Sequence, residues 1–262
     1  MENHRLQSKL EFGSGFPALL SKEIDRFKKI IFQTVAAPTM TTILYLVVFA
    51  QVLSDRVAYG SIPYVKFLTP GLMMMSMMQN AYSNSASSFL QSKMSGNIVF
   101  ILLPPISTYE MYFAYTLAGV ARAILVGFVI WLCSLLYALI IPENILWLIV
   151  FAILCSATFA ALGLLNGVVA DKWDQLANFQ TFLVMPMTFL SGVFYSIHSL
   201  PNFWQSVSYY NPVFYMIDGF RYAFFGVSDV SPWHSLIVVL VCFIIVSLVT
   251  IRIIKTGYKL RS

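Results

Sequence analysis

The chain has 262 residues, of which 59% are hydrophobic and 10% are charged. Soluble domains carry about 25% charged residues, so these few charges cannot cover a water-facing surface, and lipid must be the solvent for much of it. The net charge of +5 does not indicate nucleic-acid binding, because the basic residues gather at the two chain ends, beside hydrophobic runs. In such positions they set membrane topology and meet anionic headgroups.

Residues 1–30 comprise a polar N-terminus and an amphipathic segment at 16–30, FPALLSKEIDRFKKI. Apolar residues recur in this segment at helical spacing, and charged residues, Glu23 and Arg26 among them, fill the other face. The pattern predicts a connecting helix that lies in the plane of the lipid headgroups. An ordinary solvated surface helix is the alternative, and the direct attachment to a hydrophobic run favours the interfacial position.

Residues 31–254 form the predicted membrane domain of an all-α membrane protein. A spanning helix needs about 20 mostly apolar residues, and the chain holds six such runs. We expect spans at about 31–53, 66–90, 106–138, 144–169, 176–195 and 234–254, followed by a cytoplasmic tail at 255–262. Pro38 and Pro186 interrupt two spans, which membrane helices tolerate when neighbours satisfy the freed backbone groups.

Residues 196–233 are rich in aromatic and polar side chains and too amphipathic for a clean span. They predict a short external hairpin of two helices, broken at Asn211–Pro212, that lies at the interface or re-enters it. The aromatic residues of this stretch suit an interfacial belt; they are Trp204, Tyr209, Tyr210, Tyr215, Tyr222 and Trp233.

The basic residues predict that both termini are cytoplasmic. One side of the six-span topology carries Arg5, Lys9, Lys22, Arg26, Lys28, Lys29, Lys93, Lys172, Arg252, Lys255, Lys259 and Arg261. The opposite loops carry only Arg56, Lys66 and Arg221.

Polar side chains within the second and third spans are the candidate pathway. The second span carries Ser76, Gln79, Asn80 and Asn84, which either pack helices closely or line a path for a polar substrate. Arg122 lies within the third span, where a charge must face the bundle or water. It either meets an anionic substrate or another helix, or makes a structural hydrogen bond to carbonyls. Glu110, about 18 Å away along the same helix, cannot pair with it and lies near the cytoplasmic end.

No catalytic residue and no metal site is expected. The chain lacks the phosphate-binding motif G-x-x-x-x-G-K-[ST] and the hydrolase motifs H-E-x-x-H and G-x-S-x-G. Ser191 and His198 offer a nominal pair, but a chain this rich in serine offers one by chance. The three cysteines, Cys133, Cys155 and Cys242, lie in apolar spans without metal-ligand spacing and are predicted to be core residues.

Residues 183–226 closely resemble the signature region of type-2 ABC transporter permeases. The resemblance rests on the order and spacing of Pro186, Leu190-Ser191-Gly192, Leu200-Pro201, Asn211-Pro212 and Arg221. The segment 92–103 is similar to the family's cytoplasmic coupling helix, and Pro104–Glu110 is similar to the opening of its third span. The likeness extends over nearly the whole chain.

The resemblance implies the transmembrane subunit of a bacterial ABC exporter in the inner membrane. It implies that two copies of the chain pair and that two separate ABC ATPase subunits dock below them. ATP and Mg would bind to those partners, and no cofactor is expected in this chain. The coupling residues implied are Ile98, Val99, Phe100, Ile101 and Glu110. A short apolar helix at the cytoplasmic face can insert into a groove of such a partner, or it can merely bury against headgroups.

Two other functions stay open. A secondary transporter or channel would work without an ATPase, but ion coupling recruits acidic residues near the midplane, and the spans offer only Glu110. A membrane anchor or assembly subunit would have no transport role. The sequence does not identify the cargo, since a lipid, a glycan carrier and a hydrophobic drug all suit an aromatic, Met-rich bundle.

The sequence also gives two mutational expectations. Replacing Phe100 and Ile101 with Asp is expected to uncouple or release the ATPase. Arg122→Ala is expected to lower export more than Arg221→Ala, on the premise that Arg122 carries the larger desolvation cost.

Overall fold

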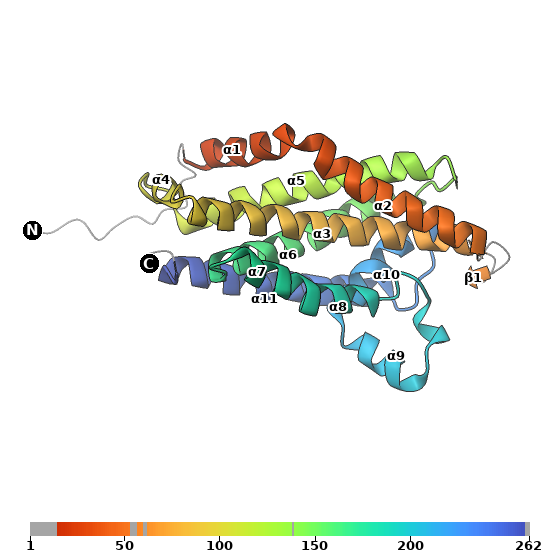
Figure 1. The fold of residues 1–262 in the computed structure, drawn as a ribbon. Coiled ribbons are helices and arrows are strands. Elements are labelled where there is room, and N and C mark those ends of the chain that lie inside the picture. Colours follow the sequence, from red (N-terminus) through yellow and green to blue (C-terminus); the bar gives the residue numbers. More distant parts are fainter. Residues whose placement is uncertain (1–14, 53–56, 60–61, 138, 260–262) are drawn as a thin grey trace, which may run out of the picture.

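The computed structural model describes residues 15–52, 57–59, 62–137 and 139–259, which form an elongated bundle of helices (Figure 1). The predicted charges Arg5, Lys9, Arg56 and Arg261 lie outside the described residues. The long helices are α1 (Gly15–Lys29), α2 (Ile31–Val52), α3 (Tyr64–Met94), α5 (Thr108–Ser134), α6 (Ile145–Val169) and α11 (Pro232–Thr256).

The remaining elements are short and lie at the two ends of the bundle or form the broken fifth run. They are β1 (Val57–Tyr59), β2 (Ile62–Pro63), α4 (Ile98–Leu102), α7 (Trp173–Phe179), a π-helical segment (Gln180–Val184), α8 (Met185–Phe189), a 3-10 turn (Ile197–Ser199), α9 (Asn202–Tyr209) and α10 (Pro212–Phe225). The two strands pair in antiparallel fashion. The start of α1, α4 and the end of α11 lie at the same end of the bundle (Figure 1).

Four helices of the described chain are long and apolar enough to cross a membrane: Ile31–Phe49, Thr108–Ser134, Ile145–Val169 and Pro232–Thr256. They coincide with four of the six predicted spans, so the all-α membrane architecture is confirmed. The predicted spans 66–90 and 176–195 fall on α3 and on α7 to α8. The first carries many Ser, Asn and Gln residues, and the second is broken by the π-helical segment and ends at Phe189.

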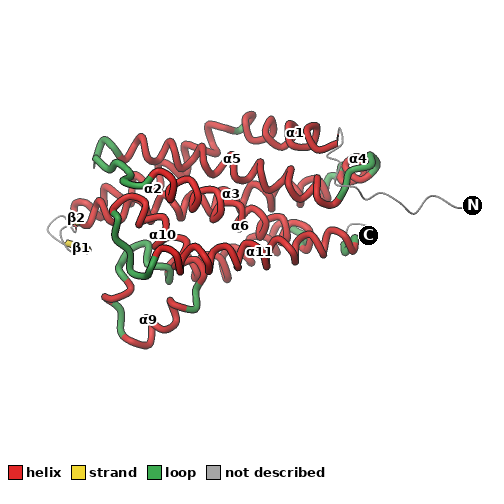
Figure 2. The backbone as a smooth tube through the Cα atoms, turned by 180° about the vertical axis from the view of Figure 1, so that it is seen from behind, coloured by secondary structure: helices red, strands yellow, loops and turns green. Residues whose placement is uncertain are grey.

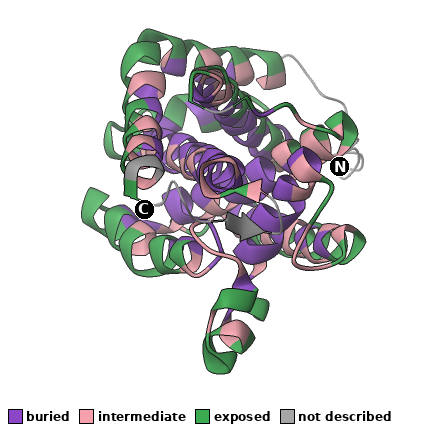
Figure 3. Cartoon of the chain, turned by 90° about the vertical axis from the view of Figure 1, so that its right-hand side faces the viewer, coloured by how far each residue is buried: buried purple, intermediate pink, exposed green. Residues whose placement is uncertain are grey.

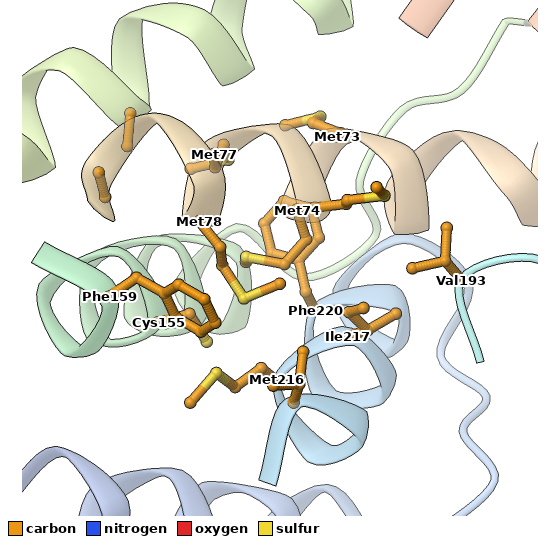
Figure 4. Packing of buried hydrophobic residues seen from close by; sticks show 14 of the residues in the cluster. Met73, Met74, Met77, Met78, Cys155, Phe159, Val193, Met216, Ile217 and Phe220 are labelled. Carbon is orange, nitrogen blue, oxygen red and sulfur yellow. The ribbon is translucent and has the colours of Figure 1, made fainter. Parts of the chain in front are cut away.

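Helix α3 is the centre of the bundle. It packs against α6, α5, α10 and α2, and buried residues gather in the middle of the bundle, with exposed residues at the periphery (Figure 3). Figure 4 shows Met74 and Met78 of α3 pointing toward α6 and α10, where Cys155, Phe159, Met216 and Phe220 lie, whereas Met73 and Met77 lie on the other side of α3. Unbranched, polarizable Met side chains fill the irregular gaps between helices that cross at different angles.

Helices α3 and α6 approach most closely at Gly163. A Cβ atom at this position would collide with the backbone carbonyl of Tyr82, so only glycine permits the contact. A hydrogen bond of 2.5 Å from Asn166 Nδ2 to the Tyr82 hydroxyl lies next to it. A backbone contact and a buried polar contact therefore fix α6 on α3.

Helix α1 packs against α5 and buries Leu19, Glu23 and Phe27, which recur every four residues on one face. The prediction that Glu23 belongs to the solvated polar face is wrong. The remaining charged residues of that face are exposed, with the exception of Arg26, which is half-buried. The buried stripe is centred on Glu23 because that carboxylate has partners on α1 and α3, described below.

The predicted break at Asn211–Pro212 is present, since α9 ends at Tyr209 and α10 begins at Pro212. Figure 2 shows α9 projecting from the bundle. Helix α10, in contrast, packs against α11, α6 and α3 and is buried along most of its length. Tyr215 is therefore a core residue, not part of an interfacial belt, and Arg221 is buried in α10, not placed in an outer loop.

An ion-pair cluster joins three segments at the end of the bundle that holds the start of α1, α4 and the end of α11. Lys93 Nζ donates to the backbone oxygens of Val168 and Ala170 and to Asp171 Oδ1, at 3.1, 2.9 and 3.1 Å. Lys259 also bonds to the Asp171 carboxylate. Hydrogen bonds from Lys259 and Lys93 hold the pKa of Asp171 below its usual value. The end of α3, the loop after α6 and the C-terminal segment are thereby joined.

Candidate functional site

One face of α3 carries a stripe of polar residues that is less buried than the rest of the helix. Between Phe67 and Leu90, every residue of α3 is buried except Ser76, Gln79, Ser83 and Ser87, and the exposed Gln91 follows one turn later. The spacings of three and four residues place these five side chains, the polar stripe, on a single helix face. In Figure 1 this part of α3 lies between α2 above and α7 to α8 below. A lipid-facing stripe would be apolar, so this face suits water or a polar partner.

The predicted pathway residues divide between this stripe and the helix face beside it. Ser76 and Gln79 belong to the polar stripe, and a hydrogen bond of 3.0 Å joins Ser76 Oγ to Thr42 Oγ1 of α2. Asn80 and Asn84 are buried and point toward α1 and α5.

Arg122 on α5 contacts these two asparagines. Its Nη2 donates to Asn80 Oδ1 at 3.1 Å, and its Nη1 donates to Asn84 Oδ1 at 3.4 Å. Arg122 therefore contacts another helix, through the side-chain carbonyl oxygens of two asparagines. These bonds fit both the functional and the structural interpretation, so a role in the pathway stays a prediction.

Arg26 and Glu23 of α1 join Asn80, Asn84 and Arg122 in one group of contacts, the polar cluster. The sequence analysis did not identify these two α1 residues as part of a site. Arg26 Nη2 donates to Asn84 Oδ1 and to the Asn84 backbone oxygen, each at 2.9 Å. Glu23 has no exposed side-chain surface; it accepts a hydrogen bond of 2.5 Å from Ser88 Oγ. Arg26 Nε lies 3.5 Å from Glu23 Oε2. The available signal was one carboxylate four residues after Leu19 and four before Phe27, in the middle of the apolar face.

The predicted coupling residues do not all face outward. Ile98 and Ile101 of α4 are buried in a cluster with Leu19 of α1 and Tyr112 of α5. Val99 and Phe100 are exposed, and with Leu102 and Leu103 they form an apolar patch at the end of the bundle. Phe100 and Leu103 are each 71% exposed. The surface that a partner could contact is therefore Val99, Phe100, Leu102 and Leu103, and Ile98 and Ile101 hold it in place.

Glu110 is buried at 3% exposure and forms the capping box of α5. Its Oε2 accepts a hydrogen bond of 2.7 Å from the Ser107 backbone N–H, and Ser107 Oγ accepts one of 3.1 Å from Glu110 N. The box turns this side chain back onto the helix start. A role in coupling would act through the orientation of the loop after α4.

The residues of the family signature join α8, α10 and α3 near the end of the bundle opposite α4. Gly192 adopts a φ of +75°, and its carbonyl accepts a hydrogen bond of 2.8 Å from Arg221 Nη2. The Arg221 guanidinium also lies 3.8 Å from the ring centroid of Phe67. Asn211 caps α10 through Val213 N, and its Nδ2 donates to Met187 O at 2.6 Å.

The other signature residues shape the backbone. Ser191 Oγ bonds to the Thr188 carbonyl, Pro186 lies in the first turn of α8, and Pro201 precedes α9. The spacing of the signature residues therefore follows the path of the chain as it leaves the bundle after α8 and returns to it in α10.

The part of the chain that the structure describes contains no group of three His, Cys, Asp or Glu side chains that could hold a metal ion. Cys155 is buried, Cys133 and Cys242 are half-buried, and all three are free. His198 lies 3.9 Å from Asp229, whose side chain is 1% exposed, and Asp229 accepts a hydrogen bond from Ser196. Ser191 is committed to its backbone bond, so the nominal Ser191–His198 pair has no support.

The family profile described as ABC-2 type transporter matches residues 15–225. An inner membrane transport permease of Escherichia coli K12, YadH, is 39% identical over 247 residues, which cover 94% of this chain and 96% of that protein. The capsule polysaccharide export inner-membrane protein BexB of Haemophilus influenzae is 22% identical over 190 residues, 72% of this chain and 69% of that protein. Nodulation protein J of Sinorhizobium fredii is 24% identical over 161 residues, 61% of this chain and 62% of that protein.

Proposed function

Because the chain belongs to the ABC-2 type transporter family and is a membrane transport permease, we propose that it works as half of an ATP-driven exporter. In this proposal two copies pair in the inner membrane and enclose the translocation pathway. Two separate ABC ATPase subunits dock at the end that holds α4. ATP and Mg bind to those subunits, and this chain binds no cofactor.

The polar stripe of α3 is the observation that carries the proposal. A single copy leaves Ser76, Gln79, Ser83 and Ser87 partly accessible on the face between α2 and α8. Ser76 bonds to Thr42 and Ser87 to the Asn84 carbonyl, but exposure of the stripe to lipid would place the Gln79 amide and the Ser83 hydroxyl in hydrocarbon. A second copy facing the first removes the stripe from lipid and gives a path lined by polar groups.

The apolar patch of α4 supports docking of the ATPase. Val99, Phe100, Leu102 and Leu103 are exposed on a short helix whose other side is anchored by Ile98 and Ile101. A rigid apolar knob of this kind suits a groove in a soluble partner. Its packing against α1 and α5 would transmit a movement of the partner to the polar cluster.

We propose six spans with both termini in the cytoplasm. To the four apolar helices this proposal adds two further spans, α3 and the run from α7 to α8, which the second copy shields from lipid. Lys93, Lys172 and Lys255 belong to the end that holds α4, and the positive-inside rule places that end in the cytoplasm. Export is the proposed direction, supported by the relative from Haemophilus influenzae, which is named for capsule polysaccharide export.

The alternative of a secondary transporter loses its main candidate residue. Glu110 was the one acidic residue available for ion coupling within the predicted spans, and in the structure it caps α5 near the end that holds α4. A carboxylate that accepts a hydrogen bond from the Ser107 backbone N–H at the start of a helix is poorly placed to exchange protons with a transport path.

Substituted-cysteine accessibility tests the path. Cysteine is placed at Gln79 or Ser83 in a chain without its three native cysteines, and a charged, membrane-impermeant thiol reagent is added to inside-out vesicles that hold the permease and its ATPase. We expect both positions to react. Control cysteines at Leu44 of α2 and Phe128 of α5, which are exposed apolar positions, should stay unmodified in lipid. Unreactive cysteines on the stripe under every nucleotide condition would rule out the proposed path.

A further inference from the structure

An apolar groove of about 450 Å³ runs between α2 and α5 on the outside of the bundle. It is lined by apolar side chains with one hydroxyl, including Val35, Thr39 and Ile43 of α2 and Leu125, Val129 and Cys133 of α5. A groove of this composition on the flank of membrane helices suits a hydrocarbon chain.

The groove begins beside the two arginines of the polar cluster. Arg122 precedes Leu125 by three residues on α5, and the residues 122, 125, 129 and 133 follow one face of that helix. Arg26 lies in the last turn of α1 and precedes Ile31, a groove residue, by five residues. Both guanidinium groups meet at Asn84.

This end of the groove carries positive charge that the described residues do not balance. Glu23 is shared between Arg26 and Lys22, whose Nζ lies 3.3 Å from Glu23 Oε1. Among the described residues Arg122 makes no ion pair, and its acceptors are two neutral amides. Charged side chains within membrane helices pair with other groups, and an anion would complete the contacts of Arg122, whose Nε is buried without a hydrogen-bond partner.

The cluster also lies beside the start of the apolar span of α2. The apolar span of α2 starts at Ile31, directly after α1, and Arg26 one turn earlier is bonded to Asn84. Arg26 and Asn84 thus lie level with the start of the α2 span, and Arg122 reaches Asn84 from the middle of α5. Basic pockets between membrane helices at the cytoplasmic boundary suit anionic headgroups.

We propose that Arg122 and Arg26 bind the headgroup of an anionic phospholipid of the inner leaflet, with one acyl chain in the groove between α2 and α5. The site lies on the opposite side of Asn80 and Asn84 from the polar stripe, so a bound lipid would hold α1 and α5 against α3 without entering the path. The inference does not rest on the ATPase partner.

Native mass spectrometry of the full chain tests this site. Protein freed of lipid in detergent is titrated with palmitoyl-oleoyl-phosphatidylglycerol or with the phosphatidylcholine of the same chains. We expect wild type to retain one phosphatidylglycerol more tightly than any phosphatidylcholine. Arg122→Gln and Arg26→Gln should each weaken that binding about fivefold, which corresponds to about 1 kcal/mol per basic residue, and Arg122→Lys should keep most of it.

Matched variants separate the site from general charge and general packing. Lys28→Gln on the exposed face of α1 and Arg252→Gln on α11 remove the same charge elsewhere and should not change the binding. Ala36→Trp fills the groove and should abolish retention, whereas Leu44→Trp places the same ring on the exposed face of α2 outside the groove and should leave it unchanged. The tryptophan pair keeps the test valid if a glutamine variant fails to fold.

Three results would overturn the proposal. Equal retention of the two lipids would show that charge does not select the occupant. If Ala36→Trp and Leu44→Trp retained phosphatidylglycerol equally, the groove would be excluded as the site of the acyl chain. A tightly bound amphiphile other than a phospholipid, found on protein taken directly from native membranes and lost in Arg122→Gln, would assign the cluster to cargo in place of membrane lipid.

Discussion

Arg221 and Arg122 differ in what surrounds their guanidinium groups. Arg221 is 4% exposed, bonds to the Gly192 carbonyl and stacks on Phe67. Arg122 is half-buried and bonds to two flexible amide side chains. The premise that Arg122 carries the larger desolvation cost is therefore wrong, and we expect the two substitutions to fail in different ways.

Arg221→Gln should destabilise the fold. It loses a charged hydrogen bond and a cation–π contact in a buried site, so we expect the free energy of unfolding to fall by about 2–3 kcal/mol. Thermal unfolding in detergent measures the change. Arg122→Gln should lower the stability less than Arg221→Gln does. An Arg221→Gln protein with the thermal midpoint of wild type would contradict the structural role.

Glu110 can be tested for capping against coupling. Glu110→Ala removes the capping box of α5 and should cost about 1 kcal/mol of stability. Glu110→Gln should retain both stability and transport, because glutamine fills the same position in capping boxes. Transport assays in vesicles with the ATPase present give the second readout. Loss of transport in the glutamine variant at unchanged stability would mean that the charge itself takes part in coupling.

At the scale of elements, the contact of α3 with α6 depends on Gly163. Gly163→Ala would place a methyl group on the Tyr82 carbonyl, and we expect a loss of about 1–3 kcal/mol from overpacking against backbone. Gly127→Ala on α5 is the matched control, because its Cβ would meet only the flexible side chain of Met77. We expect Gly163→Ala to have a lower thermal midpoint than Gly127→Ala. Equal midpoints would contradict the close approach of α3 and α6.

The buried and exposed sides of α4 should respond differently to a charge. Phe100→Asp should abolish copurification of the ATPase while the permease stays folded, because Phe100 faces solvent. Ile101→Asp should unfold this end of the bundle, because Ile101 is buried against α1 and α5. The double substitution expected from sequence would have mixed the two effects. Size-exclusion profiles and pull-down yields distinguish them.

Much of the helix pattern was predictable because apolar runs are long and their ends carry strong local signals. Residues 145–169 form α6 almost as predicted, and Asn211–Pro212 divides α9 from α10 as expected. The π-helical segment at 180–184 was not predictable, since it reflects packing and carries no turn residue. The burial of α10 was missed for the same reason: an aromatic segment suits both a core and an interface.

The candidate site was predictable only in its α3 and α5 residues. Asn80, Asn84 and Arg122 are conspicuous because polar groups are rare within apolar spans. Glu23 and Arg26 lie in a segment already rich in charge, where local sequence cannot show which residues turn inward. Their inward orientation depends on the position of α1 relative to α3, which is a tertiary property.

For the molecule as a whole, the central claim is that this permease works only with a second copy and an ATPase. The structure leaves both contact surfaces accessible: the polar stripe of α3 and the apolar patch of α4. These are the two surfaces that the proposed second copy and the proposed ATPase would cover.

Copurification from native membranes tests this claim most directly. The full chain is tagged at its C-terminus and extracted in mild detergent, in parallel with the Phe100→Asp variant. We predict two copies of the chain with an equimolar soluble protein that carries the G-x-x-x-x-G-K-[ST] motif and hydrolyses ATP in the complex, and we predict that Phe100→Asp releases it. A homo-oligomer without a nucleotide-binding partner, identical for wild type and variant, would contradict the account.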